Sequence, residues 1–98
     1  MTIKQAHADT IDGSVDGIDW LGGVGTFICT ADNFNGSTVT LQAKVGTAAP
    51  FAVGDDTTVT VSGGGAFTLP ACELLIDVSG TTLAGGSYAI EDTIGQGY

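Results

Sequence analysis

The chain has 98 residues, of which 43% are hydrophobic and 13% are charged, so we expect one small globular domain and not a disordered chain. Two lysines and eleven acidic residues leave a formal net charge of −9. Such a surface repels phosphate backbones and anionic lipids, so nucleic acid and membranes are excluded as expected partners. The charge favours a neutral or basic protein as partner.

The first 23 residues predict an extended N-terminal arm. Four aspartates recur there at short intervals: Asp9, Asp12, Asp16 and Asp19. This spacing fits one face of a helix, but Gly13 and Gly17 disfavour a helix and four like charges on one face repel. We predict that residues 1–23 form a partly ordered arm with an apolar anchor at its end, and that the glycines at 22, 23 and 25 form a hinge.

The apolar side chains of this arm are the candidate partner-interface residues: Ile11, Ile18, Trp20 and Leu21. Tryptophan is the residue type most enriched at the energetic centres of protein interfaces. The alternative is that Trp20 closes one end of the domain core. Both interpretations are left open by the sequence.

Residues 24–98 predict the domain itself. Val, Thr and Leu alternate with a period of two in short segments separated by glycine, which is typical of half-buried strands. The expected strands, in chain order, are 26–31, 38–45, a short edge piece at 51–53, 57–61, 66–69, 72–78 and 87–92. The sequence DNFNG at 32–36 predicts a tight turn, GDD at 54–56 a second turn, and Pro70 ends a strand. Six to seven short strands indicate an all-β fold, a small antiparallel β-sandwich or barrel of jelly-roll or immunoglobulin-like type.

The two cysteines fall on the expected core faces of their strands. Cys29 alternates with Phe27 and Ala31, and Cys72 with Leu74 and Ile76. The favoured interpretation is two buried free thiols that act as small hydrophobic residues. A disulfide between them is the alternative, if the two strands face each other across the core.

The sequence gives no set of residues that indicates catalysis. His7 is the sole histidine and lies among small residues, far from a nucleophile. Adjacent acids such as Asp55 and Asp56 point to opposite sides of a strand and are better explained by a turn. The aspartates of the arm lack the spacing and closing glutamate of a calcium loop, and the glycine run at 22–25 lacks the lysine of a phosphate loop. We therefore predict a protein that is not an enzyme, with no cofactor and no metal.

Several segments of the chain resemble the small β-rich virion proteins of tailed bacteriophages. The matching segments are GTF at 25–27, FNGSTVTLQ at 34–42, GAFTLP at 65–70 and VSG at 78–80. The family pattern has a tryptophan-containing middle segment and an arginine in the fifth strand. This chain has VGTAAPF at 45–51 and Leu74-Leu75 at those places.

The resemblance implies a capsid decoration, or cement, protein that binds the major capsid protein on the virion surface. It also implies synthesis in the host bacterial cytoplasm, and residues 1–13 contain no apolar run typical of a signal peptide. Binding in many copies adds avidity, and a homo-oligomer is expected, with a trimer as one option.

Two other functions remain as alternatives. A carbohydrate-binding or host-adhesion module would present surface aromatics, for which Phe34, Phe51 and Tyr98 are the candidates. Phe27, Phe67 and Tyr88 fall on expected core positions. A head–tail connector component would form rings of fixed number.

Overall fold

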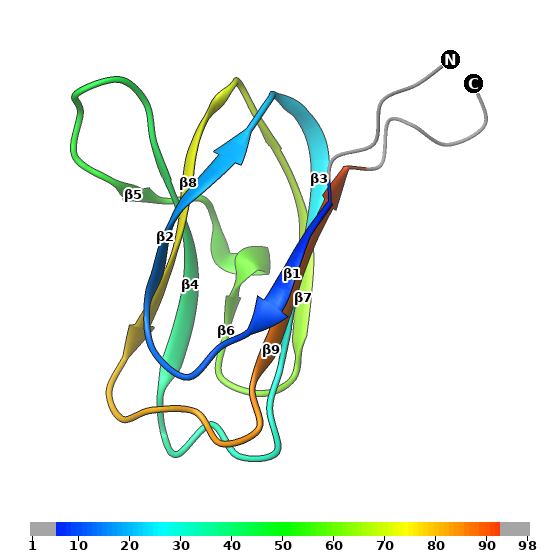
Figure 1. The fold of residues 1–98 in the computed structure, drawn as a ribbon, viewed down its shortest axis with the longest axis vertical. Coiled ribbons are helices and arrows are strands. Elements are labelled where there is room, and N and C mark those ends of the chain that lie inside the picture. The colour runs from blue at the N-terminus through cyan, green and yellow to red at the C-terminus, as the bar shows by residue number, and fades with distance from the viewer. Residues whose placement is uncertain (1–5, 93–98) are drawn as a thin grey trace.

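The computed structural model describes residues 6–92, which form nine strands and one 3-10 helix in two antiparallel sheets. The sheets face each other as the two layers of a sandwich (Figure 1). The strands of sheet A, in spatial order, are β1 (Ala6–Thr10), β9 (Ser87–Asp92), β3 (Gly23–Thr30) and β7 (Gly63–Leu69). Sheet B contains β2 (Val15–Trp20), β8 (Cys72–Ser79), β4 (Thr38–Lys44) and β5 (Phe51–Ala52), and β6 (Thr58–Val59) also pairs with β4. The predicted all-β antiparallel sandwich is confirmed.

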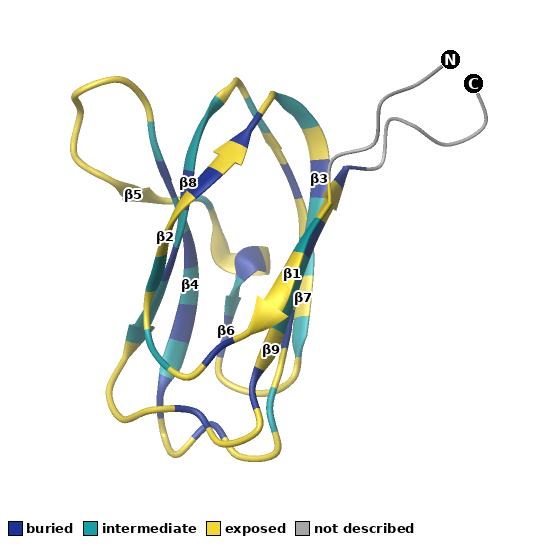
Figure 2. Cartoon of the chain, in the orientation of Figure 1, coloured by how far each residue is buried: buried dark blue, intermediate teal, exposed yellow. Residues whose placement is uncertain are grey.

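The core lies between the sheets and follows from strand alternation. In β4 every second side chain is buried, and in β3 Phe27 and Cys29 are buried while Ile28 and Thr30 are exposed. Figure 2 shows this alternation along the strands. The fully buried side chains with the largest volume are Trp20, Phe27, Leu41, Leu74, Ile76 and Ile90. The described residues contain no helix of the length and hydropathy that a membrane span needs.

The predicted N-terminal arm is wrong for residues 6–20, because both of its halves are strands of the sandwich. Strand β1 pairs with β9 from Ala6↔Glu91 to Thr10↔Ser87, and β2 pairs with β8 from Val15↔Ile76 to Trp20↔Cys72. The division into an arm at 1–23 and a domain at 24–98 is corrected accordingly: the domain begins at β1. The predictions that concern residues 1–5 and 93–98 lie outside the described residues.

The glycines at 22, 23 and 25 form a tight turn and a close packing contact instead of a hinge. Gly22 and Gly23 have φ angles of 102° and 111°, which lets the chain pass from β2 in sheet B to β3 in sheet A. A Cβ atom on Gly25 would lie 2.6 Å from Cη2 of Trp20 and 2.7 Å from Cζ of Phe67. The absence of a side chain on Gly25 therefore leaves the space that the indole ring of Trp20 occupies in the core.

Two other expected strands have different bounds. The glycines at 63–65 were expected to be a link, but they belong to β7 and pair with β3 from Cys29↔Gly63 to Phe27↔Gly65. The strand expected at 57–61 is reduced to Thr58–Val59, because the 3-10 helix η1 (Asp55–Thr57) precedes it. The turn expected at Asp55 and Asp56 is thereby confirmed as a helical turn. The turn at 32–36 is also confirmed, with φ angles of 54° at Asn35 and 76° at Gly36.

Both cysteines are free thiols in the structure. Cys29 is buried, as expected, whereas Cys72 is half-buried at the start of β8. Burial raises the pKa of both thiols above the usual value of 9.0. Because the thiol form is favoured in the folded state, this contribution to stability is present below pH 9.0 and is lost as the pH rises through the raised pKa.

We expect both thiols of the native protein to react slowly with iodoacetamide near neutral pH, because the thiolate is the reactive form. Alkylation followed by peptide mass spectrometry should show Cys72 modified before Cys29, and both modified at least about tenfold faster in guanidinium chloride. Equal rates in the native and denatured protein would contradict the burial of Cys29.

Candidate functional site

The structure separates the four predicted interface residues. Ile11, Ile18 and Trp20 have exposed fractions of 4%, 6% and 1%, whereas Leu21 is 68% exposed. Ile18 and Trp20 lie two positions apart in β2, so both point into the sandwich, and Leu21 follows in the turn to β3. The prediction that the three buried residues contact a partner is wrong, and the alternative for Trp20, that it closes one end of the core, is confirmed. Trp20 packs against Phe67 with ring centroids 5.0 Å apart.

Leu21 lies in the turn between β2 and β3, and two other connections lie at the same end of the sandwich as this turn (Figure 1). These connections are the turn 21–22, the loop 45–50 and the turn 70–71. The first turn touches the third, since a Cβ on Gly22 would lie 3.1 Å from the backbone N of Ala71. The loop follows Lys44, which pairs with Glu73 at the start of β8. We call these three connections, together with Val24 and Phe51 beside them, the apolar end.

The apolar end combines exposed hydrophobic side chains with an absence of charge. Its three connections contain no charged residue. The large hydrophobic side chains exposed there are Leu21 at 68%, Val24 at 37%, Val45 at 43% and Phe51 at 48%. Val45 was expected to point inward but begins the loop, where the alternation of β4 ends. Leu21 follows β2 and Phe51 belongs to β5, which are the two outer strands in the order β2-β8-β4-β5 of sheet B, so these side chains are spread across this end of the sandwich. Exposed apolar surface is a candidate for binding another molecule.

The opposite end of the sandwich has polar loops that are hydrogen-bonded to one another. The backbone of Asn33 and Ala84 exchanges two hydrogen bonds of 3.2 and 2.9 Å. The side-chain amide of Asn35 donates to the carbonyl of Thr82 over 2.8 Å. The hydroxyl of Thr81 donates to the carbonyl of Asn35 over 2.8 Å, and that of Ser37 donates to the carbonyl of Thr81. The loops of this polar end are therefore held by internal hydrogen bonds. Val61, in the connection from β6 to β7 at the same end (Figure 1), is 70% exposed.

The outer faces of the two sheets also differ. The outer face of sheet B is charged, with Asp19 and Glu73 paired across β2 and β8 and Lys44 opposite Glu73. Glu73 also accepts a hydrogen bond of 3.0 Å from the backbone N of Gly17. On the outer face of sheet A most side chains are small, with Ile28 opposite Ala89 and the charged Glu91 opposite Thr26. A shallow hollow of about 510 Å³ lies there over β1, β9 and β3.

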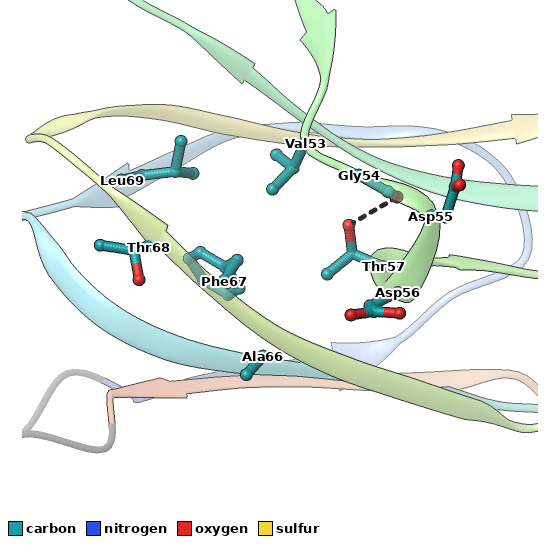
Figure 3. A pocket seen from close by; sticks show the side chains of 9 residues that line it. All are labelled: Val53, Gly54, Asp55, Asp56, Thr57, Ala66, Phe67, Thr68 and Leu69. Carbon is teal, nitrogen blue, oxygen red and sulfur yellow. Dashed lines mark hydrogen bonds between the residues drawn. The ribbon is translucent and has the colours of Figure 1, made fainter.

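A side crevice of about 400 Å³ opens between β7 and the segment that contains η1. Figure 3 shows Val53, Phe67 and Leu69 around this space, with Thr57 beyond them. The hydroxyl of Thr57 donates to the carbonyl of Gly54 over 3.2 Å, and Asp55 and Asp56 are exposed next to it. The segment that lines the crevice opposite β7 follows β5, which has two residues.

The ionisable side chains of residues 6–92 are distributed over both sheets. No group of three or more His, Cys, Asp or Glu side chains that could hold a metal ion occurs in that part of the chain. His7 is half-buried in β1 opposite Ile90. Burial, and next the carboxylate of Asp9, raise the pKa of Tyr88.

The aromatic candidates for sugar binding do not form a platform in the described part of the chain. Phe34 is buried with an exposed fraction of 8%, Phe51 is 48% exposed, and Tyr98 lies outside the described residues. Phe27 and Phe67 are in the core as expected, and Tyr88 is half-buried. Phe51 is thus the one large exposed aromatic side chain among residues 6–92, and it belongs to the apolar end.

The sequence singled out Leu21 as an interface candidate and Phe51 as a candidate for sugar binding, but it did not single out Val24 or Val45. The signal for Val45 was the uncharged run VGTAAPF at 45–51, which was interpreted only as a loop with an edge strand. Comparisons with models of protein families, with curated proteins and with solved structures found no match.

Proposed function

We propose that the chain is a structural, non-catalytic protein of the virion, a capsid decoration protein that binds the major capsid protein through its apolar end. The observation that carries this proposal is that four of the six exposed large hydrophobic side chains of the described residues lie at one end of a small sandwich with a net charge of −9, and that the three connections there are uncharged. The resemblance to phage virion proteins supplies the class of partner.

A partner that covers exposed apolar side chains removes their surface from water, which is favourable. Leu21, Val45 and Phe51 are already exposed and gain free energy when a partner covers them, at about 25 cal/mol per Å² of apolar surface. The three connections carry no charge that would have to be desolvated. The acidic groups elsewhere favour a basic surface around the contact and discourage contact with packaged DNA.

Binding in many copies compensates for the small contact that each copy can make with its apolar end. Each contact at the apolar end is small, and a shell offers many equivalent sites, so the shell is covered even when single contacts are modest. The sandwich holds the exposed side chains on a fixed frame, which reduces the entropy lost on binding. Attachment across subunit boundaries would raise the free energy needed to deform the shell.

The decisive experiment is cryo-electron microscopy of particles purified from cells that make the chain and from cells in which its gene is deleted. A decoration protein gives extra density on the outer surface of the shell in the first sample alone. Density in a ring at one vertex would favour the connector alternative, and absence from the particles would contradict a virion protein. A glycan array tests the sugar-binding alternative, which clear binding to any sugar would favour.

We expect Leu21→Asp and Phe51→Asp to reduce attachment by about 30-fold each, because a loss of about 2 kcal/mol is typical of a central interface residue. The measurement is the fraction of purified protein that co-sediments with undecorated particles over a range of concentrations.

The matched control is Thr40→Asp, which adds the same charge to the outer face of sheet B, away from the apolar end. Thermal melting establishes that all three variants fold. If Leu21→Asp and Phe51→Asp bind as the control does, the apolar end is not the attachment surface.

A further inference from the structure

Strand β7 forms one edge of sheet A. Its residues, Gly63–Leu69, pair with β3 in a continuous register, and within residues 6–92 no strand pairs with the other side of β7. In an antiparallel strand, alternate residues direct their N–H and C=O groups to opposite sides. About half of the backbone groups of β7 therefore face away from β3 and can accept a further strand.

Strand β7 also lacks the features that protect the other sheet edges of residues 6–92. Edge strands avoid pairing with other chains through charged side chains, bulges, proline or short length. Strand β1 carries Asp9, the register of β2 is irregular between Val15 and Ile18, and β5 and β6 have two residues each. Strand β7 has the sequence GGGAFTL, with no charge and no proline, and its register has no shift. Of these edges, β7 is the one best suited to accept another strand.

The side crevice of about 400 Å³ lies along this edge (Figure 3). In β7, Phe67 is buried and Leu69 is half-buried, whereas Ala66 and Thr68 are exposed, so the first two side chains point toward the interior of the sandwich. Val53 lines the crevice on the opposite side. A strand added to β7 would direct every second side chain to the same side as Phe67 and Leu69. An apolar side chain at such a position would enter the crevice.

The part of the crevice next to η1 is acidic. Asp55 and Asp56 are exposed there, and none of the nine lining residues is cationic. Asp56 lies against Gly65, because a Cβ atom on this glycine would be 2.7 Å from Cβ of Asp56. Gly65 faces the same side of β7 as Phe67, two residues further on. An added strand with an apolar residue beside Phe67 would therefore place the residue two positions away beside Asp56, where a lysine or arginine meets opposite charge.

We propose that β7 and the side crevice bind an extended segment of another protein as an added strand of sheet A, in which an apolar residue and a lysine or arginine lie two positions apart. Backbone hydrogen bonds to β7 supply the affinity, and the crevice with its two carboxylates selects the side chains. A second copy of this chain fits poorly, because it brings two lysines and a net charge of −9. The inference goes beyond the proposed attachment, since no residue that lines the crevice belongs to the apolar end.

Nuclear magnetic resonance of the full chain with a synthetic peptide tests the proposal. The probe is the peptide TVTVTKT, blocked at both ends, whose valines and lysine lie on one side of an extended chain. With the peptide at about 1 mM, amide hydrogen exchange of alternate residues of β7 should slow at least about tenfold, because the N–H groups that face away from β3 become hydrogen-bonded. The amides of β1, at the other edge of sheet A, are the internal control and should not change.

Modified peptides distinguish an added strand from other modes of binding. Methylation of every second backbone nitrogen removes the donors on one side of the peptide. Methylation on the side that faces β7 should abolish binding, and methylation on the other side should leave the affinity within about threefold. Replacement of the lysine by glutamate should weaken binding about tenfold, and about 1 M NaCl should weaken the binding of the lysine peptide.

A double variant of the protein tests the two carboxylates. Asp55→Asn with Asp56→Asn should weaken binding of the lysine peptide about threefold to tenfold. The matched control is Asp12→Asn with Asp16→Asn, which removes two exposed charges at β2, the opposite edge of sheet B, and should leave the affinity within about twofold. Thermal melting establishes that both double variants fold.

Several results would overturn the proposal. They are no binding at about 1 mM peptide, equal effects of the two methylated peptides, and equal weakening by the two double variants. Slow exchange of alternate β7 amides without peptide would show that another segment of the chain occupies the edge, or a second copy if the protection rises with protein concentration, and either result refutes the proposal. No measurement uses particles, so the peptide site and the proposed function fail separately.

Discussion

Deletion of residues 1–23 is expected to abolish folding. The deletion removes β1 and β2, one edge strand from each sheet, and exposes the backbone edges of β9 and β8. It also removes Ile11, Ile18 and Trp20 from the core. Each buried side chain of this size contributes about 1.5–3 kcal/mol, and the total stability of a small domain is about 5–15 kcal/mol. The lost contacts are therefore comparable with the whole free energy of folding.

Circular dichroism and thermal melting of the purified deletion variant measure this effect. The extended arm predicted from the sequence would instead leave a folded domain when residues 1–23 are deleted. Deletion of residues 1–5 is the control, because it removes none of the nine strands, and we expect it to melt cooperatively. A cooperative melting transition of the longer deletion near that of the wild type would show that β1 and β2 are not part of the folded core.

Gly25→Ala is expected to destabilise the protein by about 3 kcal/mol, which is at the upper end for an overpacked core. The added Cβ would lie 2.6 Å from Cη2 of Trp20 and 2.7 Å from Cζ of Phe67, far closer than carbon atoms can approach. Both rings are buried, with exposed fractions of 1% and 6%, so neither can move away freely. For a domain of this size, 3 kcal/mol lowers the melting temperature by roughly 12–24 °C.

The measurement is urea denaturation of Gly25→Ala beside Gly13→Ala. A Cβ on Gly13 would meet no atom within 4 Å, so this control should change stability by less than about 0.5 kcal/mol. Trp20→Phe, combined with Gly25→Ala, should recover part of the loss because the smaller ring leaves space for the methyl group. Equal denaturation midpoints for Gly25→Ala and the wild type would refute the packing of Trp20 over Gly25.

The fold class and the central strands could be predicted from the sequence. In residues 38–44 alternation of apolar and threonine-rich positions is strict, and the strand forms there as expected. The turn at Asn35 and Gly36 was predictable because both residues tolerate positive φ, which the structure confirms. Strand 87–92 was also predicted with its observed bounds.

Strand β2 and the first part of β7 could not be predicted because the alternation of buried and exposed side chains is interrupted in both. In β2 the register shifts between Val15 and Ile18, so the period of two that reveals a strand is interrupted. In β7 the glycines at 63–65 have no side chains and show no alternation, yet they pair with β3. Both segments become strands because neighbouring strands offer hydrogen-bond partners, which is a tertiary effect.

By itself the sequence determined the all-β class, the acidic surface and most of the core, since these depend on residue type and on the period of two. Only the tertiary structure decided that Trp20 is buried and Leu21 is exposed, although the two are adjacent. It also placed the turn 21–22 at the same end of the sandwich as the connections 45–50 and 70–71, which lie far along the chain (Figure 1). Antiparallel pairing of distant strands sets which connections share an end, and local patterns carry no information about that pairing.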